Sequence, residues 1–264
     1  MGIFEHYQSR YEERKQEEFT IGEFLEICKE DQTAYANAAE RLLQAIGEPE
    51  LIDTANDPAL SRIFSNRVIS RYPAFSEFYG MEEAIEQIVS YLKHAAQGLE
   101  EKKQILYLLG PVGGGKSSLA ERLKELMQHV PIYMLKGSPV NDHPFCLFDV
   151  KEDGDILQKE YGIPKRYLKT IMSPWARKRL HEFNGDITQF KVVRVYPSVL
   201  DQVGIAKTEP GDENNQDISS LVGKVDIRRL EQYAQNDPDA YSYSGSLCKA
   251  NQGLMEFVEM FKAP

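Results

Sequence analysis

Residues 104–118 read QILYLLGPVGGGKSS, and this stretch decides the fold. Its first part, QILYLLG, is a short apolar run bounded by a glycine, a pattern typical of a buried strand. The next part, Gly110 to Ser117, matches the spacing G-x-x-x-x-G-K-[ST] of a phosphate-binding loop. A glycine-rich turn can match this spacing by chance. The strand expected before it and the helix expected after it favour nucleotide binding.

The residues after the loop complete a larger unit. SSLAERLKELMQHV (117–130) repeats its apolar residues at helical spacing, and PIYMLKG (131–137) is typical of a second strand. Strand, loop, helix and strand in this order form a βαβ unit, which predicts a parallel sheet with helices on both faces. The expected fold class is therefore α/β, a P-loop NTPase. KVVRVYP (191–197) and LMEFVEMF (254–261) are further strand candidates.

The chemistry of the loop follows from its residue types. Glycines allow the loop to point backbone N–H groups at phosphate oxygens, and the helix that follows places its positive end beneath them. Lys116 is expected to reach the β- and γ-phosphates of ATP, Ser117 to ligate Mg²⁺, and Ser118 to contact the α-phosphate. The predicted ATP-binding residues are Gly110, Pro111, Val112, Gly113, Gly114, Gly115, Lys116, Ser117 and Ser118.

Hydrolysis also needs an acidic residue near the hydrated metal ion, and such residues often end a neighbouring strand. LMEFVEM (254–260) offers Glu256 and Glu259. The usual second motif has four apolar residues and then Asp-Glu; here Val258 takes the Asp position and Glu259 matches the Glu. We predict a catalytic or metal-directed role for Glu259 and Glu256. The alternative is that both glutamates simply face solvent.

The chain before the phosphate loop has a different sequence pattern, which is mainly helical. Residues 1–74 are predicted to form a helical N-terminal region, and residues 75–264 the P-loop domain. Within the first region, Thr20 and Glu23 fit a capping box that opens a short helix. A helix is expected from Tyr35 to Ile46, and Pro58 is expected to open another with Val68 and Ile69 on its buried face.

Composition limits the function classes. The 264 residues carry 31 Lys and Arg against 41 Asp and Glu, a net charge of −10, which disfavours a nucleic-acid partner. Neither a signal peptide nor an apolar run of membrane-spanning length is found, so the expectation is a cytoplasmic protein with no membrane partner. Three widely spaced cysteines predict free structural thiols and neither zinc nor disulfides.

Other polar residues allow two interpretations each. His143 is more simply a hydrogen-bonded structural histidine than a functional group. Arg228 and Arg229 offer an arginine finger for a neighbouring subunit, but surface arginines on a helix are the simpler interpretation. Residues 212–215 fit either a substrate-facing loop or a solvated one.

Five stretches resemble the PrkA family of bacterial serine protein kinases, also called YeaG. The first covers residues 72–124 and includes YPAFSEFYGMEEAI and the phosphate loop. The others are SPVNDHPFCLF (138–148), YGIPKRYLKTIMSPWA (161–176), EPGDENNQDISSLVGKVDIR (209–228) and YSGSLCKANQGLMEFVEMFKAP (243–264). Together they span most of residues 70–264.

This resemblance implies an AAA+ ATPase module on the N-terminal side of a longer protein with a C-terminal kinase region. The ATPase domain is then expected to be truncated at its C-terminal side, because later AAA+ elements would lie beyond residue 264. The fragment alone is expected to bind MgATP with little turnover.

The resemblance also implies a function. The whole protein is expected to be a homo-oligomeric serine/threonine kinase that acts on protein substrates during stress or starvation. One alternative is an ATP-dependent protein remodeller or protease. Another, suggested by Val258, is a nucleotide-gated scaffold without turnover.

Overall fold

The structure is a computed structural model that describes residues 2–13, 17–56, 58–99, 103–209 and 218–259. The chain divides into two compact units. The first contains residues 1–35 and 131–264, and the second contains residues 36–130. The boundary expected at residue 74 falls inside the second unit and stays a prediction.

A three-stranded antiparallel sheet lies at the centre of the first unit. Its order is β1–β5–β4, formed by β1 (Glu17–Thr20), β5 (Lys191–Val195) and β4 (Ile132–Leu135). The positions of β4 and β5 confirm the strands predicted at 131–137 and 191–197. Their pairing is antiparallel, with Tyr133 opposite Arg194, so this sheet differs from the parallel sheet that was expected.

Helix α2 (Ile21–Glu30) anchors the core of this unit. Its predicted capping box is confirmed: the Glu23 N–H donates to Thr20 Oγ1 at 3.2 Å, and the Thr20 N–H donates to the Glu23 carboxylate at 2.7 Å. The buried Phe24 ring packs 5.4 Å from Tyr133 and 5.6 Å from Phe145, measured between centroids. The other α-helices of the unit are α1 (Ile3–Glu13), α7 (Gly154–Tyr161), α8 (Pro174–Glu182), α9 (Ser219–Val222) and α10 (Ser246–Lys249).

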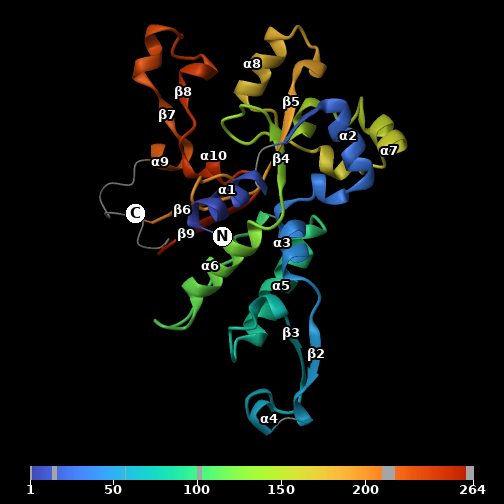
Figure 1. Cartoon of the computed structure of the whole chain (residues 1–264), viewed down its shortest axis with the longest axis vertical. Coiled ribbons are helices and arrows are strands. Elements are labelled where there is room, and N and C mark those ends of the chain that lie inside the picture. Colours follow the sequence, from blue (N-terminus) through green and yellow to red (C-terminus); the bar gives the residue numbers. More distant parts are fainter. Residues whose placement is uncertain (1, 14–16, 57, 100–102, 210–217, 260–264) are drawn as a thin grey trace. The chain divides into compact units, whose positions relative to one another are not determined.

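A separate pair of strands carries the acidic motif. Strands β6 (Ile205–Thr208) and β9 (Leu254–Phe257) run parallel, with Ile205 opposite Leu254 (Figure 1). Strand β9 confirms the strand predicted near residue 254. Among the described residues, this is the one parallel pairing; β7 (Lys224–Val225) and β8 (Tyr241–Ser242) pair antiparallel.

Three longer helices and a hairpin form the second unit. Helix α3 (Ala38–Ile46) packs against α5 (Glu82–Ala96) and α6 (Lys116–Met127). The antiparallel hairpin of β2 (Glu50–Asp53) and β3 (Val68–Arg71) extends from this bundle, with α4 (Pro58–Phe64) at its far end (Figure 1).

The N-terminal region is only partly as expected. Helix α3 confirms the expected end at Ile46, with Gly47 as its cap, but it begins at Ala38 instead of Tyr35. Helix α4 begins at Pro58 but stops at Phe64, because Ser65 and Asn66 adopt left-handed φ angles of 54° and 58°. Residues 68–71 then form β3, so Val68 and Ile69 lie on a strand. With β1 and β2, the region expected to be helical contains three strands.

The apolar run before the phosphate loop is not a strand in this structure. Residues 105–110 have no regular secondary structure, and the Ile105 and Leu109 side chains are 70% and 83% exposed. An isolated extended segment gains no stability without a neighbouring strand to pair its backbone. No strand pairs with this segment in the described part of the chain. The βαβ unit expected here is therefore not confirmed.

Candidate phosphate-binding site

The loop from Gly110 to Gly115 has a backbone that only glycine adopts easily. Gly113 and Gly115 have left-handed φ angles of 78° and 76°, and the Gly114 N–H donates to the Pro111 carbonyl at 3.1 Å. A Cβ on Gly115 would lie 2.9 Å from Met81 Sδ, and one on Gly114 would lie 3.1 Å from the Pro111 oxygen. The glycines are therefore needed both for the turn and for the close approach of its neighbours.

Helix α6 begins directly after this turn. Its first backbone hydrogen bond runs from the Leu119 N–H to the Gly115 carbonyl at 2.9 Å. The N–H groups of Lys116, Ser117 and Ser118 precede that bond and have no partner within the helix. Together with the helix dipole, they make this end of α6 a favourable place for an anion.

Lys116 adds a positive charge to the same loop. Its Nζ atom donates to the carbonyl of Gly110 at 2.7 Å and to that of Pro111 at 2.6 Å. The ammonium group is therefore held over the loop by neutral carbonyls. A phosphate oxygen bears a full charge and would compete well for these donors.

The loop fits the phosphates of a nucleotide. Two left-handed glycines, the start of a helix and a lysine bound to the loop form a cradle that side chains at 114 or 115 would crowd. The fit of Mg²⁺ is less complete. Ser117 is exposed and could supply one hydroxyl ligand, but the described residues contain no group of three or more His, Cys, Asp or Glu side chains that could hold a metal ion.

The rest of α6 holds the loop in place. Leu119, Leu123 and Met127 are buried along one face, as their spacing predicts. The Arg122 side chain donates from Nε to the Ala74 carbonyl at 2.7 Å. The start of α6 is thus fixed by apolar packing and by a polar contact with the segment that leads into α5.

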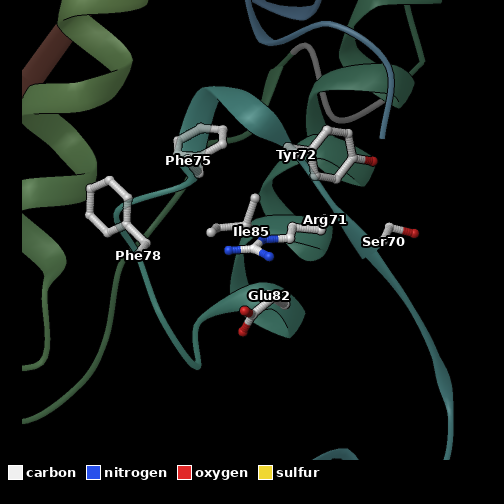
Figure 2. A pocket seen from close by; sticks show the side chains of 7 residues that line it. All are labelled: Ser70, Arg71, Tyr72, Phe75, Phe78, Glu82 and Ile85. Atoms are coloured by element: carbon white, nitrogen blue, oxygen red, sulfur yellow. The ribbon is translucent and has the colours of Figure 1, made fainter. Parts of the chain in front are cut away.

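The segment that precedes α5 also lines a small hollow, together with the start of α5 itself. Figure 2 shows Phe75 and Phe78 on one side of this hollow and Tyr72 and Ser70 on the other, with Arg71 between them and Glu82 below Arg71. Glu82 is the first residue of α5 and directly follows Met81, the residue that packs against Gly115. Sequence patterns did not identify Met81 as part of the site, because a methionine at the start of a helix resembles ordinary core.

The two acidic candidates lie at the end of β9 in the first unit. Glu256 is within the strand, opposite Lys207 of β6, and its Oε2 atom is shielded from solvent. Glu259 follows the strand in an exposed turn with a left-handed φ of 51°. The Val258 N–H donates to the Thr208 carbonyl at 2.9 Å, which extends the β6–β9 contact up to this turn. Their catalytic roles stay predictions.

The structure favours the simpler interpretations of the other polar residues. His143 Nδ1 accepts a hydrogen bond from the Phe145 N–H at 3.1 Å, and its ring packs edge-on against Phe145. Arg229 donates to the Asp239 carbonyl at 3.0 Å. Arg228 lies beside it on an exposed 3₁₀ helix. Residues 212–215 lie outside the described part of the chain.

The cysteines are free thiols, as predicted. Cys28 and Cys146 are buried, and burial raises the pKa of the Cys146 thiol to about 12. Burial also raises the pKa of Cys28 well above its ordinary value. Neither is a nucleophile at neutral pH, since the thiolate is the reactive form.

Comparison with known proteins connects this geometry to a family. The family model described as the PrkA AAA domain matches residues 19–264. The chain is 78% identical over 268 aligned residues to "Serine/threonine kinase YeaG" of Escherichia coli K12, and the match covers all of this chain and 42% of that protein. It is 34% identical over 260 residues to "ATP-dependent protease PrkA" of Bacillus subtilis, covering 95% of this chain and 39% of that protein.

No solved structure matches the chain. Within the residues that the structure describes, no helix is both long enough and apolar enough to cross a membrane. The family match covers more than nine-tenths of the sequence and includes both the phosphate loop and the acidic strand. The chain therefore belongs to the PrkA family, and what it contains is the AAA domain of that family.

Proposed function

We propose that this chain is the ATP-binding AAA+ module of a PrkA-type bacterial serine/threonine protein kinase. The observation that carries the proposal is the loop at Gly110–Ser117. Its left-handed glycines, the N–H groups at the start of α6 that have no partner within the helix, and the Lys116 ammonium bound to the loop together suit a polyphosphate.

In this proposal the loop holds the phosphates of ATP through backbone N–H groups, and Lys116 turns from the loop carbonyls to the β- and γ-phosphates. Ser117 directs its hydroxyl to Mg²⁺, and Ser118 contacts the α-phosphate. The metal ion, when bound, neutralises part of the phosphate charge. Glu259, with Glu256, is the proposed acidic group for hydrolysis, because it follows β9 at the position of the usual glutamate.

The finer fold is also a proposal. We infer that residues 104–110 form a strand of a parallel P-loop sheet in the complete protein. Ile105, Tyr107 and Leu109 are apolar and exposed, and they alternate as the residues on one face of a strand do. The division into a helical N-terminal region to residue 74 and an ATPase domain from residue 75 belongs to the same proposal.

Binding of nucleotide is the first test. Calorimetry of the chain with MgATP should show binding, and Lys116→Ala should weaken it by about 10- to 100-fold through loss of a charge-assisted contact. Lys93→Ala is the matched control, since Lys93 is an exposed lysine on α5 of the same unit. No binding by the folded wild-type chain, or equal loss in both variants, would contradict the proposal.

Kinase activity belongs to the whole protein, because the chain spans about two-fifths of the curated relatives it matches. We propose a cytoplasmic homo-oligomer that phosphorylates protein substrates in a stress or starvation response. The name of the Escherichia coli relative supports a kinase. The name of the more distant Bacillus subtilis relative supports the alternative, an ATP-dependent protease.

Labelled ATP separates these two activities. The whole protein should transfer the γ-phosphate to protein serine or threonine, and Lys116→Ala should abolish the transfer. ATP-dependent loss of casein without any phosphoprotein would favour the protease. Binding of ATP with neither activity nor ATP hydrolysis would favour the scaffold suggested by Val258. The chain alone should bind MgATP and hydrolyse it slowly.

A further inference from the structure

The turn that leads into β9 is held by three amide side chains. Asn251 Nδ2 donates to the Val140 carbonyl at 2.7 Å. Gln252 Nε2 donates to the Asn141 carbonyl at 2.8 Å and to the Tyr133 carbonyl at 2.9 Å. These bonds connect the turn with the loop after β4 and with β4 itself.

A side-chain amide also donates a hydrogen bond in the reverse direction, from the loop after β4 to the residues just before the turn. Asn141 Nδ2 donates back to the Lys249 carbonyl at 3.1 Å, so each loop presents an amide to the backbone of the other. Asn141 is buried and has a left-handed φ of 53°. We refer to Asn141, Asn251 and Gln252 as the amide clamp. The bonds from Gln252 and Asn141 are partly shielded from solvent, whereas the bond from Asn251 to Val140 is exposed. A shielded bond contributes more to holding the turn, because water replaces it less readily.

Backbone geometry shows that the turn is fixed tightly. The Gly204 N–H donates to the Lys249 carbonyl, and the Leu254 N–H donates to the Gly204 carbonyl, both at 2.8 Å. A side chain on Gly253 would collide with the Gly204 carbonyl, so only glycine fits there. Gln252 itself has a left-handed φ of 66°, an uncommon conformation for a residue with a side chain.

The position of β9 depends on this clamp. Within the described residues, β9 has one strand partner, β6. Gln252 supplies a second connection, because the Tyr133 carbonyl belongs to β4 of the three-stranded sheet. Glu256 lies four residues after Gln252 and Glu259 seven residues after it. If the backbone at Gln252 moved, β9 would therefore move with it, and so would both acidic residues.

We propose that Asn251 and Gln252 are positioning residues that set the place and direction of Glu256 and Glu259 during ATP hydrolysis. This inference rests on the proposed function of Glu259. The clamp residues touch neither nucleotide nor metal in this proposal, and they act only through β9.

A double-mutant cycle in the whole protein tests the inference. Gln252→Ala should lower kcat for ATP hydrolysis by about 10- to 100-fold, as expected for a residue that orients a catalytic group. The Kd for MgATP should stay unchanged, because the phosphate loop does not involve the clamp. In a background that carries both Glu256→Gln and Glu259→Gln, Gln252→Ala should cause no further loss, since both residues that it positions are already disabled.

A second readout does not depend on activity. Hydrogen exchange at the backbone amides of Leu254–Phe257 should become faster in Gln252→Ala, while the amides of Lys191–Val195 in β5 stay as protected as in the wild type. Gln158→Ala is the matched control, because Gln158 is an exposed glutamine on α7 of the same unit. It should change neither exchange nor kcat.

The outcomes separate the two claims. If Glu259→Gln leaves hydrolysis unchanged, the proposed role of Glu259 fails, and this inference fails with it. If Glu259→Gln is impaired but Gln252→Ala is not, only the clamp inference is overturned. An equal loss from Gln252→Ala in both backgrounds, or unchanged exchange in β9, also overturns it. If Gln252→Ala does not fold, Asn251→Ala and Gln252→Glu carry the same test with the same expected results.

Discussion

Gly115 is the residue on which the phosphate loop depends most. Its φ of 76° equals that of Gly47, which ends α3, but the two surroundings differ. Open space surrounds the Cβ position at Gly47, whereas at Gly115 it points at Met81 Sδ. Replacement by alanine strains the left-handed backbone at Gly115, where ψ is 3°, by roughly 1–2 kcal/mol. Gly47 has a ψ of −173°, a region essentially restricted to glycine, so alanine strains its backbone at least as much. Only at Gly115 must the loop or Met81 also move.

We therefore expect Gly47→Ala to lower the free energy of unfolding at least as much as Gly115→Ala, because Met81 is flexible and can move aside. Gly115→Ala should also weaken MgATP binding by roughly tenfold or more, through misaligned N–H groups at the start of α6. Urea titration and calorimetry measure the two effects. Wild-type ATP affinity in Gly115→Ala, or weakened binding in Gly47→Ala, would contradict this account.

At the scale of single residues, local spacing predicts the form of the loop, while the binding roles of its residues stay predictions. The left-handed glycines, the start of α6 and the place of Lys116 all follow from the order of residues 110–117. Met81 and Gln252 were missed, because their contacts join residues more than 30 positions apart. No local pattern distinguishes a supporting methionine from a core methionine.

At the scale of elements, ion pairs fix the 3₁₀ helix Pro238–Ala240 against α8. Lys178 Nζ contacts Asp237 at 2.7 Å and Asp239 at 2.6 Å, and Arg179 contacts Asp239 at 3.0 Å. The hydrogen bond from Lys178 is the main cause that lowers the pKa of Asp237 below its ordinary value. The same bond is the main cause that raises the pKa of Lys178.

We expect the ion pairs between α8 and residues 237–239 to weaken at acidic pH. A carboxyl group whose pKa is lower in the folded chain stabilises it above the ordinary pKa, and this stability is lost as pH falls through the folded pKa. The free energy of unfolding should therefore decline below about pH 4. In Lys178→Met the decline should be smaller, because Asp237 then titrates similarly in both states. Urea titrations between pH 7 and 3 measure it, with Lys93→Met as a control that should behave like the wild type.

Local sequence patterns predicted some strands and missed others. Strands β4, β5 and β9 were predicted because each is a short apolar run. Strands β1, β2 and β3 were missed, because EEFT, ELID and VISR are short and rich in polar residues. Pairing was predicted least well. The choice between parallel and antiparallel neighbours is made by contacts such as Tyr133 with Arg194, which lie far apart in sequence.

At the scale of the whole molecule, the phosphate loop and the acidic strand belong to different compact units. Binding of phosphate requires only the loop and the start of α6, which form one local structure. Hydrolysis, as proposed here, requires Glu259 as well. The two activities should therefore be separable. Substitutions in the amide clamp should affect turnover alone, whereas Lys116→Ala should affect binding and, with it, every activity of the whole protein.

The exposed apolar run at residues 105–109 should differ in hydrogen exchange between this chain and the complete protein. A segment without a strand partner should exchange its amide hydrogens quickly, because no ladder of backbone hydrogen bonds protects it. If this run is a strand of a parallel sheet in the complete protein, its amides should be protected there by at least about 100-fold relative to the chain alone. The amides of β5 should be protected in both. Hydrogen exchange read by mass spectrometry measures this difference, and fast exchange of residues 105–109 in both proteins would show that the run remains unpaired.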